Sequence, residues 1–289
     1  MRHRSIVAVA SVLGIFGILL AGVPNAGAET RLEKIKRTGV LTAGTRTASI
    51  PFAYIDKDNE WKGFSIDLLG EMRARLEKKL GKPIKLDKKE VNPKTRIAMV
   101  ANHTIDIECG STTFNRRRDG TVDFTINFFF TGSQLLVKKG SAIKSTDDLA
   151  GKRAGATQGT TNEKALRRVQ PKAIMVTFQD HAAGFLALEQ GKIVSYVTDG
   201  ILLAGLAAKS RTPDAYEVVG PLFSKDPYSC IVPENDSDWR DFANHTLMEL
   251  IDSGKFFTMY EKWFGPQGVV PYPMSPEVKT YLTMQSMPR

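Results

Sequence analysis

The chain has 289 residues and a formal net charge of +9, with 40 lysines and arginines against 31 aspartates and glutamates. The lysines are scattered and form no basic stripe between aromatic residues, so the excess charge indicates a solvated surface and argues against a nucleic-acid-binding protein. Two cysteines and four scattered histidines lack the spacing of zinc ligands, and we expect neither a metal nor a cofactor.

The N-terminus has the three parts of a secretory signal peptide. Arg2 and Arg4 precede an apolar stretch over residues 6–23, and a small-residue cleavage site ends at Ala28, just before Glu29. A membrane anchor is the alternative, but no later run approaches the roughly 20 apolar residues that a spanning helix needs. We therefore predict that residues 1–28 are a signal peptide, which leaves enough chain for one large or two modest domains.

An exported chain meets an oxidising compartment, where a lone pair of cysteines tends to be joined. We therefore expect a disulfide between Cys109 and Cys230. In the chain-entropy model, a bridge that closes so long a loop stabilises the fold by about 4–5 kcal/mol.

The first half of the mature chain alternates strands and helices. The expected elements are strands at 40–44, 84–91 and 104–108, an irregular stretch from 45 to 54, a turn at 56–59, and helices at 66–80 and 96–101. This order favours an α/β domain with a mainly parallel sheet. Ligands of such sheets bind at the carboxyl ends of the strands, where Arg46 and Ser111 are expected to lie.

A second α/β unit follows the apolar run 124–137, which we expect to leave the first domain and enter the second. The expected strands are 153–156, 174–178 and 193–198, and the expected helices open at 157–161, 181 and 201. The last stretch, from about residue 222 to helices at 241–264, is expected to return to the first domain. A chain that crosses twice between domains can form a hinge and a cleft.

Several motifs together resemble family 3 of the periplasmic solute-binding proteins, which bind polar amino acids. They are GFSIDL (63–68), DIECGSTT (106–113) followed by Arg118, DLAGK (148–152), QGTT (158–161), GKF (254–256) and YEKWF (260–264). Their order and spacing cover nearly the whole mature chain.

This resemblance implies the two-lobed α/β fold of type II periplasmic binding proteins, with two hinge crossings. Residues 29–132 and 222–289 would form lobe 1, and residues 133–221 would form lobe 2. The implied function is that of a periplasmic monomer that binds a free amino acid and delivers it to an inner-membrane ABC permease.

The resemblance also implies which residues bind the backbone groups of the amino acid. The α-carboxylate would be bound by Arg118, Thr113, Thr160 and Thr161, the ammonium by Asp199 and Ser111, and Thr157 would add a further contact. Such a ligand calls for a planar cation, hydroxyl and backbone donors, and one carboxylate. Structural roles remain open for several of them: residues 116–118 could form a solvated face, and Asp199, Thr160 and Thr161 could only cap helices.

Arg46 is the residue that indicates which side chain is bound. Relatives that prefer basic or polar side chains resemble one another in carrying an aspartate there, so the arginine should favour a ligand carboxylate. Arg96 and His181 fall where glutamate/aspartate-binding relatives place further donors. Arg46 could instead form a surface ion pair, and His181 could simply begin a helix. Pro93 replaces an expected serine donor, so the choice among glutamate, aspartate and an amide stays open.

Two other functions share this fold. Exported cyclohexadienyl dehydratases resemble the family, and such an enzyme would need an acid in the cleft, for which Glu108 and Glu163 are candidates. The sensing module of a receptor or channel would need a membrane segment or a signalling domain. We expect a binding protein and not an enzyme.

Overall fold

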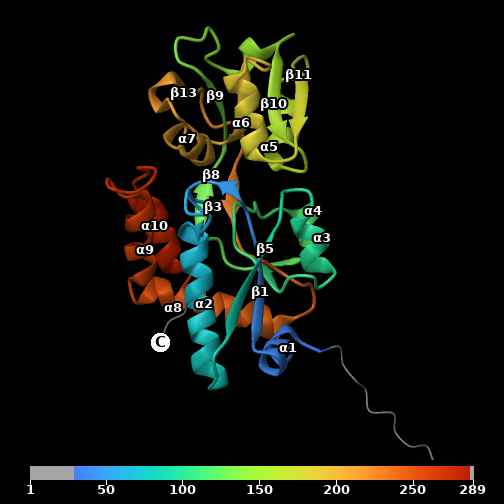
Figure 1. Cartoon of the computed structure of the whole chain (residues 1–289), viewed down its shortest axis with the longest axis vertical. Coiled ribbons are helices and arrows are strands. Elements are labelled where there is room, and N and C mark those ends of the chain that lie inside the picture. The colour runs from blue at the N-terminus through green and yellow to red at the C-terminus, as the bar shows by residue number, and fades with distance from the viewer. Residues whose placement is uncertain (1–28, 287–289) are drawn as a thin grey trace, which may run out of the picture.

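The computed structural model describes residues 29–286. The predicted signal peptide lies outside these residues. The described chain forms two lobes, one above the other in Figure 1, which are joined by extended strands. Within it, no helix combines the length and the apolar character needed to cross a bilayer.

The first lobe is built on a five-stranded sheet with the order β5-β1-β6-β15-β7. These strands are β1 (Val40–Thr45), β5 (Lys85–Glu90), β6 (Ile107–Glu108), β7 (Asp123–Phe124) and β15 (Ile231–Val232). β1 is parallel to β5 and β6, whereas β15 is antiparallel to β6 and β7. The sheet is mixed and not mainly parallel, because β15 belongs to the segment that returns from the second lobe.

Helices and a small sheet complete the first lobe. They are α1 (Arg31–Thr38), α2 (Phe64–Leu80), α3 (Arg96–Ala101), α4 (Arg116–Asp119), α8 (Ser237–Asp252), α9 (Lys255–Phe264), α10 (Pro276–Met284), and β2 (Ala48–Ser49), β3 (Ala53–Ile55) and β4 (Trp61–Lys62). The predicted helix 66–80 is present as α2, which packs on the core through Leu68, Leu69, Met72 and Leu76, whereas Ile66 is only half-buried. The sequence did not predict α1, α10 or the small sheet.

The second lobe has a sheet with the order β11-β10-β12-β9-β13. Its elements are β9 (Ser133–Lys138), β10 (Arg153–Thr157), β11 (Ile174–Phe178), β12 (Ser195–Asp199), β13 (Tyr216–Val219), α5 (Thr161–Val169), α6 (His181–Glu189), α7 (Gly200–Ala208), and the 3-10 turns η1 (Thr146–Leu149) and η2 (Pro213–Ala215). β10, β11 and β12 are parallel, and β9 pairs antiparallel with β12 and β13. The three predicted strands and helices of this unit are therefore present.

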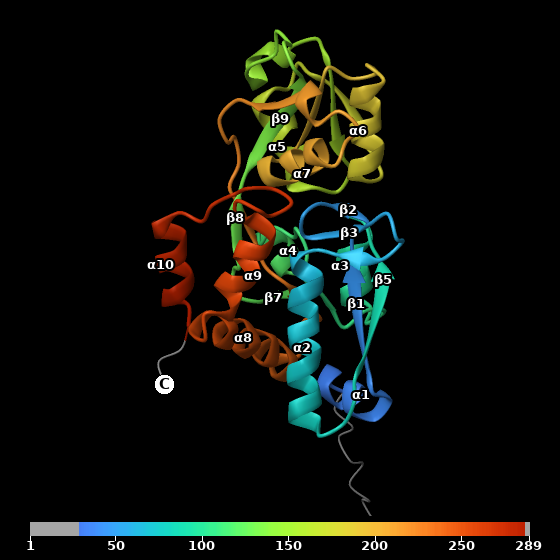
Figure 2. The ribbon, with the colours of Figure 1, turned by 60° about the vertical axis from the view of Figure 1, so that its left-hand side comes forward.

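The lobes are connected at β8 (Phe129–Thr131) and β14 (Asp226–Tyr228), which pair antiparallel. Figure 2 shows β8 between the lobes. Aromatic packing fixes these hinge strands to the first lobe: the ring of Phe129 lies 4.9 Å from that of Phe52 and 5.7 Å from that of Tyr228, measured between centroids. The chain thus crosses between lobes twice, as the fold class requires.

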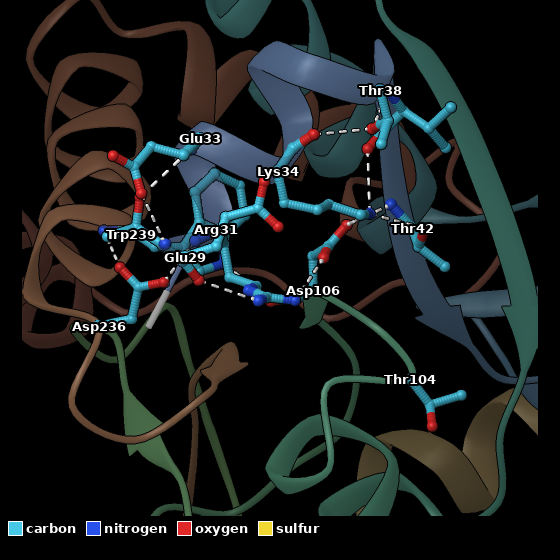
Figure 3. A network of polar contacts seen from close by, with 12 residues as sticks. Glu29, Arg31, Glu33, Lys34, Thr38, Thr42, Thr104, Asp106, Asp236 and Trp239 are labelled. Atoms are coloured by element: carbon cyan, nitrogen blue, oxygen red, sulfur yellow. Dashed lines mark hydrogen bonds and ion pairs between the residues drawn. The ribbon is translucent and has the colours of Figure 1, made fainter. Parts of the chain in front are cut away.

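Asp106 joins the N-terminal helix to the core of the first lobe (Figure 3). Its carboxylate, 1% exposed, accepts hydrogen bonds from Lys34 Nζ at 2.6 Å and from the backbone N–H of Thr42 at 2.8 Å. Its carbonyl accepts the indole N–H of Trp239 at 2.8 Å. This aspartate of the 106–113 motif therefore links α1, β1 and α8.

The predicted disulfide between Cys109 and Cys230 is present, with 4.1 Å between the two Cα atoms. Both cysteines lie in the first lobe, next to the neighbouring strands β6 and β15. Serine at both positions is expected to lower the free energy of unfolding by about 2–5 kcal/mol, because the unfolded chain loses a constraint over 121 residues. Chemical denaturation of the oxidised protein and of the double variant measures this, and a difference below about 0.5 kcal/mol would contradict it.

Candidate functional site

The ten predicted ligand residues all lie where the two lobes face each other, near the ends of strands. The first lobe contributes Arg46 after β1, Arg96 at the start of α3, Ser111 and Thr113 after β6, and Arg118 in α4. The second contributes Thr157 at the end of β10, Thr160 and Thr161 at the start of α5, His181 at the start of α6, and Asp199 at the end of β12. Nine of them are buried, and Thr161 is half-buried.

The lobes touch each other across this cleft. A Cβ on Gly205 of α7 would lie 2.3 Å from the carbonyl oxygen of Ile50, so only glycine fits against the first lobe there. Gly159 has a φ of +77°, and a Cβ on it would lie 3.2 Å from the Cα of Lys94. The guanidinium of Arg118 also donates to the carbonyl of Gly159 at 3.3 Å. The arrangement is a closed one.

Three arginines of the first lobe are buried in this closed cleft. Arg118 donates through Nη1 to the carbonyl of Thr113 at 2.8 Å, and Arg96 donates through Nη1 to the carbonyl of Ser111 at 3.2 Å. Arg96 Nη1 also lies 3.9 Å from a carboxylate oxygen of Glu108, and its Nε is buried without a partner. The Arg46 side chain is 3% exposed and forms no hydrogen bond or ion pair with any part of the described chain.

Burial lowers the pKa values of these guanidinium groups, but the side chains remain cationic. Desolvation, helped by the charge of Arg96, lowers the pKa of Arg46 to about 10 and that of Arg118 to about 9. Desolvation also lowers the pKa of Arg96. Because each group remains protonated near neutral pH, the first lobe presents concentrated positive charge that the protein only partly neutralises.

In the second lobe, His181 is held by two neighbouring hydroxyls. Its Nδ1 lies 2.8 Å from the hydroxyl oxygen of Tyr196 and 3.3 Å from that of Thr157, and these two oxygens are 2.6 Å apart. Burial, with the charges of Arg46 and Arg96 nearby, lowers the pKa of His181 well below its usual value. The imidazole is therefore neutral at physiological pH and serves as a hydrogen-bonding group.

Asp199 is a buried carboxylate held by residues of both lobes. It accepts a hydrogen bond from Asn162 Nδ2 at 2.9 Å and one from the hydroxyl of Tyr228 at 2.5 Å. It precedes α7 but forms no capping hydrogen bond, so it does not act as a helix cap. Thr160, by contrast, does cap α5 through the N–H of Glu163 at 3.0 Å.

Asp226 is a buried carboxylate in hinge strand β14 that the sequence did not single out. Its Oδ1 accepts the hydroxyl of Thr113 at 2.8 Å from the first lobe and that of Thr161 at 2.7 Å from the second. Ser224 donates to the other oxygen. Since a hydroxyl has one proton, Thr113 and Thr161 have none left for a ligand carboxylate, and a contact from them would come from backbone N–H groups.

The two carboxylates considered for an enzyme both lie beside an arginine. Glu108 is buried: one oxygen accepts the hydroxyl of Thr112 at 2.5 Å, and the other lies 3.9 Å from Arg96 Nη1 without a hydrogen-bond partner among the described residues. Glu163 accepts the N–H of Gly159 at 3.0 Å and the guanidinium of Arg167 at 3.1 Å. Between residues 29 and 286, no group of three or more histidine, cysteine, aspartate or glutamate side chains could hold a metal ion. The geometry adds nothing in favour of acid–base chemistry.

Comparisons of the chain with known proteins agree on one family. Residues 41–266 match the profile of the bacterial extracellular solute-binding proteins, family 3. The chain is similar to an L-glutamate/L-aspartate-binding protein of Pseudomonas aeruginosa, at 38% identity over 86% of each chain. It is also similar to a glutamate/aspartate import solute-binding protein of Salmonella typhimurium, at 35% identity over 91% of this chain and 89% of that one.

Among solved structures, a mutant of ArgBP from T. maritima superposes with a TM-score of 0.74 at 27% identity, over 81% of this chain and 98% of that one. Profile, relatives and structure agree with the two-lobed fold and confirm the family predicted from the motifs. The chain belongs to the bacterial extracellular solute-binding proteins, family 3.

Proposed function

We propose that this protein binds a free acidic amino acid, L-glutamate or L-aspartate, in the interlobe cleft and delivers it as a periplasmic monomer to an inner-membrane ABC importer. The observation that carries the proposal is the buried Arg46, which lies in a cleft of three arginines and forms no hydrogen bond or ion pair among the described residues. The charge of Glu108 acts on it, but the same carboxylate also acts on Arg96 and Arg118, so one negative charge is shared by three cations. A buried charge without a partner is costly, so a bound carboxylate would stabilise it. Two relatives named for glutamate and aspartate support the same ligand class.

The ligand's backbone groups would be shared between the lobes. Nη1 and Nη2 of Arg118 each donate one N–H to a backbone carbonyl. The other three of its five N–H groups are free to form a bidentate bond with the α-carboxylate. Backbone N–H groups of Thr113, Thr160 and Thr161 would add donors. Asp199 would accept the ammonium, with Ser111 beside it.

The distal carboxylate would lie between the lobes as well. Arg46 and Arg96 would hold it from the first lobe, Arg96 through its Nε–H, which is buried without a partner among the described residues, and Arg46 through its guanidinium. The neutral His181, with Thr157 behind it, would donate from the second lobe. A ligand that touches both lobes lowers the free energy of the closed state, which is the state the importer would recognise.

The division of the chain is proposed with this function. Residues 1–28 would be the signal peptide, residues 29–132 and 222–289 lobe 1, and residues 133–221 lobe 2. The paired strands β8 and β14 lie close to these two boundaries, which supports such a hinge.

Isothermal titration of the refolded protein with L-glutamate, L-aspartate, L-glutamine and L-arginine tests the proposal. We expect the two acids to bind and Arg46→Ala to weaken them by about 2–5 kcal/mol, or roughly 30-fold to several thousand-fold in Kd, because a buried charge pair is broken. Lys89→Ala, which removes an exposed cation from β5, is the control. Preference for glutamine or arginine would leave the family intact and overturn the acidic ligand.

A further inference from the structure

A cavity of about 450 Å³ opens beside Arg118 at the mouth of the cleft, and it shares the lining residues Thr113, Arg118, Thr160 and Thr161 with the proposed amino-acid site. Segments of both lobes and of the hinge line this mouth pocket. Its charged lining is formed by Arg117 and Arg118 of α4, Lys164 and Arg168 of α5, and Lys225 and Asp226 beside and in β14. The contact of Arg118 with the carbonyl of Gly159 joins the two lobes at this point, and four of the lining cations belong to none of the proposed ligand contacts.

The mouth pocket carries positive charge that the protein does not neutralise. None of its five cations forms an ion pair with a carboxylate of the described chain, in contrast to Arg167 on the same helix, which pairs with Glu163. The one carboxylate in the lining, Asp226, is saturated by three hydroxyl donors. With every lining group ionised, five positive charges face one negative charge.

Closure of the lobes creates this concentration of charge. Lys164 belongs to the second lobe, and its pKa is lowered by desolvation and then by the charges of Arg117 and Arg118 from the first. Like charges that approach one another from two bodies oppose closure, and the penalty grows where water is partly excluded. An anion between them would turn this repulsion into attraction for both lobes.

We propose that the mouth pocket is a second ligand site, which binds a divalent oxyanion such as hydrogen phosphate when the lobes are closed. The anion would bridge Arg117 of the first lobe to Lys164 and Arg168 of the second. Arginine and lysine are the side chains that bind phosphate oxygens most strongly, and the cavity has room for the anion with water around it. The anion acts as a co-ligand and is not the transported solute.

Thermodynamic linkage makes this site measurable. An anion that binds only the closed state must raise the affinity for the amino acid that also favours closure, and the two effects are reciprocal. At a fixed ionic strength, replacing chloride by inorganic phosphate at about pH 8 is expected to lower the Kd of L-glutamate by about fivefold or more, the lower end of common coupling.

The variant Lys164→Gln/Arg168→Gln should bind the amino acid in chloride at least as tightly as the native protein, because two of the charges that oppose closure are removed, and it should lose the phosphate effect. Arg167→Gln is the control, because it removes one positive charge from the same helix outside the pocket and should keep the effect. The proposal is overturned if phosphate and chloride give equal affinities, or if the double variant responds to phosphate as the native protein does.

Thermal unfolding provides a readout that needs no amino acid. Phosphate should raise the Tm of the native protein and of Arg167→Gln more than that of the double variant, which separates site binding from the general stabilising action of phosphate. If neither acid binds in chloride, the proposed function is wrong, but the Tm comparison still tests whether the mouth pocket binds phosphate. Equal shifts in the three proteins would then overturn it.

Discussion

Replacing Arg118 with alanine is expected to weaken the binding of L-glutamate and L-aspartate by about 2–5 kcal/mol, or roughly 30-fold to several thousand-fold in Kd. Arg118 is 3% exposed, and its guanidinium donates to two carbonyls, one from each lobe. Its removal would leave the α-carboxylate without a cation and would also break a contact that joins the lobes. Titration calorimetry at constant pH and salt measures the change.

A second variant separates the contribution of the planar, bidentate guanidinium of Arg118 from that of its charge, and a third serves as a control. Arg118→Lys keeps the charge but cannot form the bidentate bond, so its affinity should fall between those of the native protein and the alanine variant. Arg116→Ala removes an exposed cation two residues away and should leave Kd unchanged within about twofold. If Arg118→Ala binds within threefold of the native protein, the α-carboxylate is held elsewhere.

The arginine run 116–118 illustrates what sequence could and could not predict. A run of three cations usually faces solvent. Only the spacing of Arg118 from the motif at 106–113 favours it as the ligand-binding arginine of the three. The fold explains the choice, because the short helix α4, capped by Asn115, turns Arg118 inward and leaves Arg116 and Arg117 exposed. Which cation of such a run is buried depends on an acceptor in the other lobe, here the carbonyl of Gly159. The local sequence pattern contains no information about that acceptor.

Arg46 was predictable because it directly follows a strand, at the edge where the ligand of an α/β sheet binds, whereas Asp199, the last residue of β12, was predicted from the motif resemblance. Asp226 was not, since it lies in a three-residue hinge strand with no periodic pattern and acquires its role only when both lobes approach it. The mixed sheets escaped prediction for a related reason. Strand direction depends on the path of the returning chain and not on the strand's own residues.

Affinity for the acidic amino acids is expected to fall as the pH drops below about 7, by about tenfold per pH unit. Burial, together with the nearby Asp226, raises the pKa of the Asp199 carboxyl to about 7. The protonated form cannot pair with the ligand's ammonium, whereas the ionised form can. Protons and ligand therefore compete for Asp199, and ligand binding lowers its pKa.

The groups around Asp199 favour this direction of the effect. The hydrogen bonds from Tyr228 and Asn162 and the charge of Arg96 stabilise the carboxylate, but they do not outweigh its desolvation and the repulsion from Asp226. An incoming ammonium supplies the missing counter-charge. His181 does not titrate in this range, because burial and two arginines keep its pKa well below the usual value.

Calorimetry in two buffers with different ionisation enthalpies measures the proton directly. Near pH 6, binding should release about one proton per ligand, and near pH 8 it should release almost none. Asp199→Asn should bind weakly at every pH and show neither the slope nor the release. A native protein whose Kd is the same at about pH 5.5 and pH 8 would mean that Asp199 is ionised before the ligand arrives, and that the ammonium does not supply its missing counter-charge.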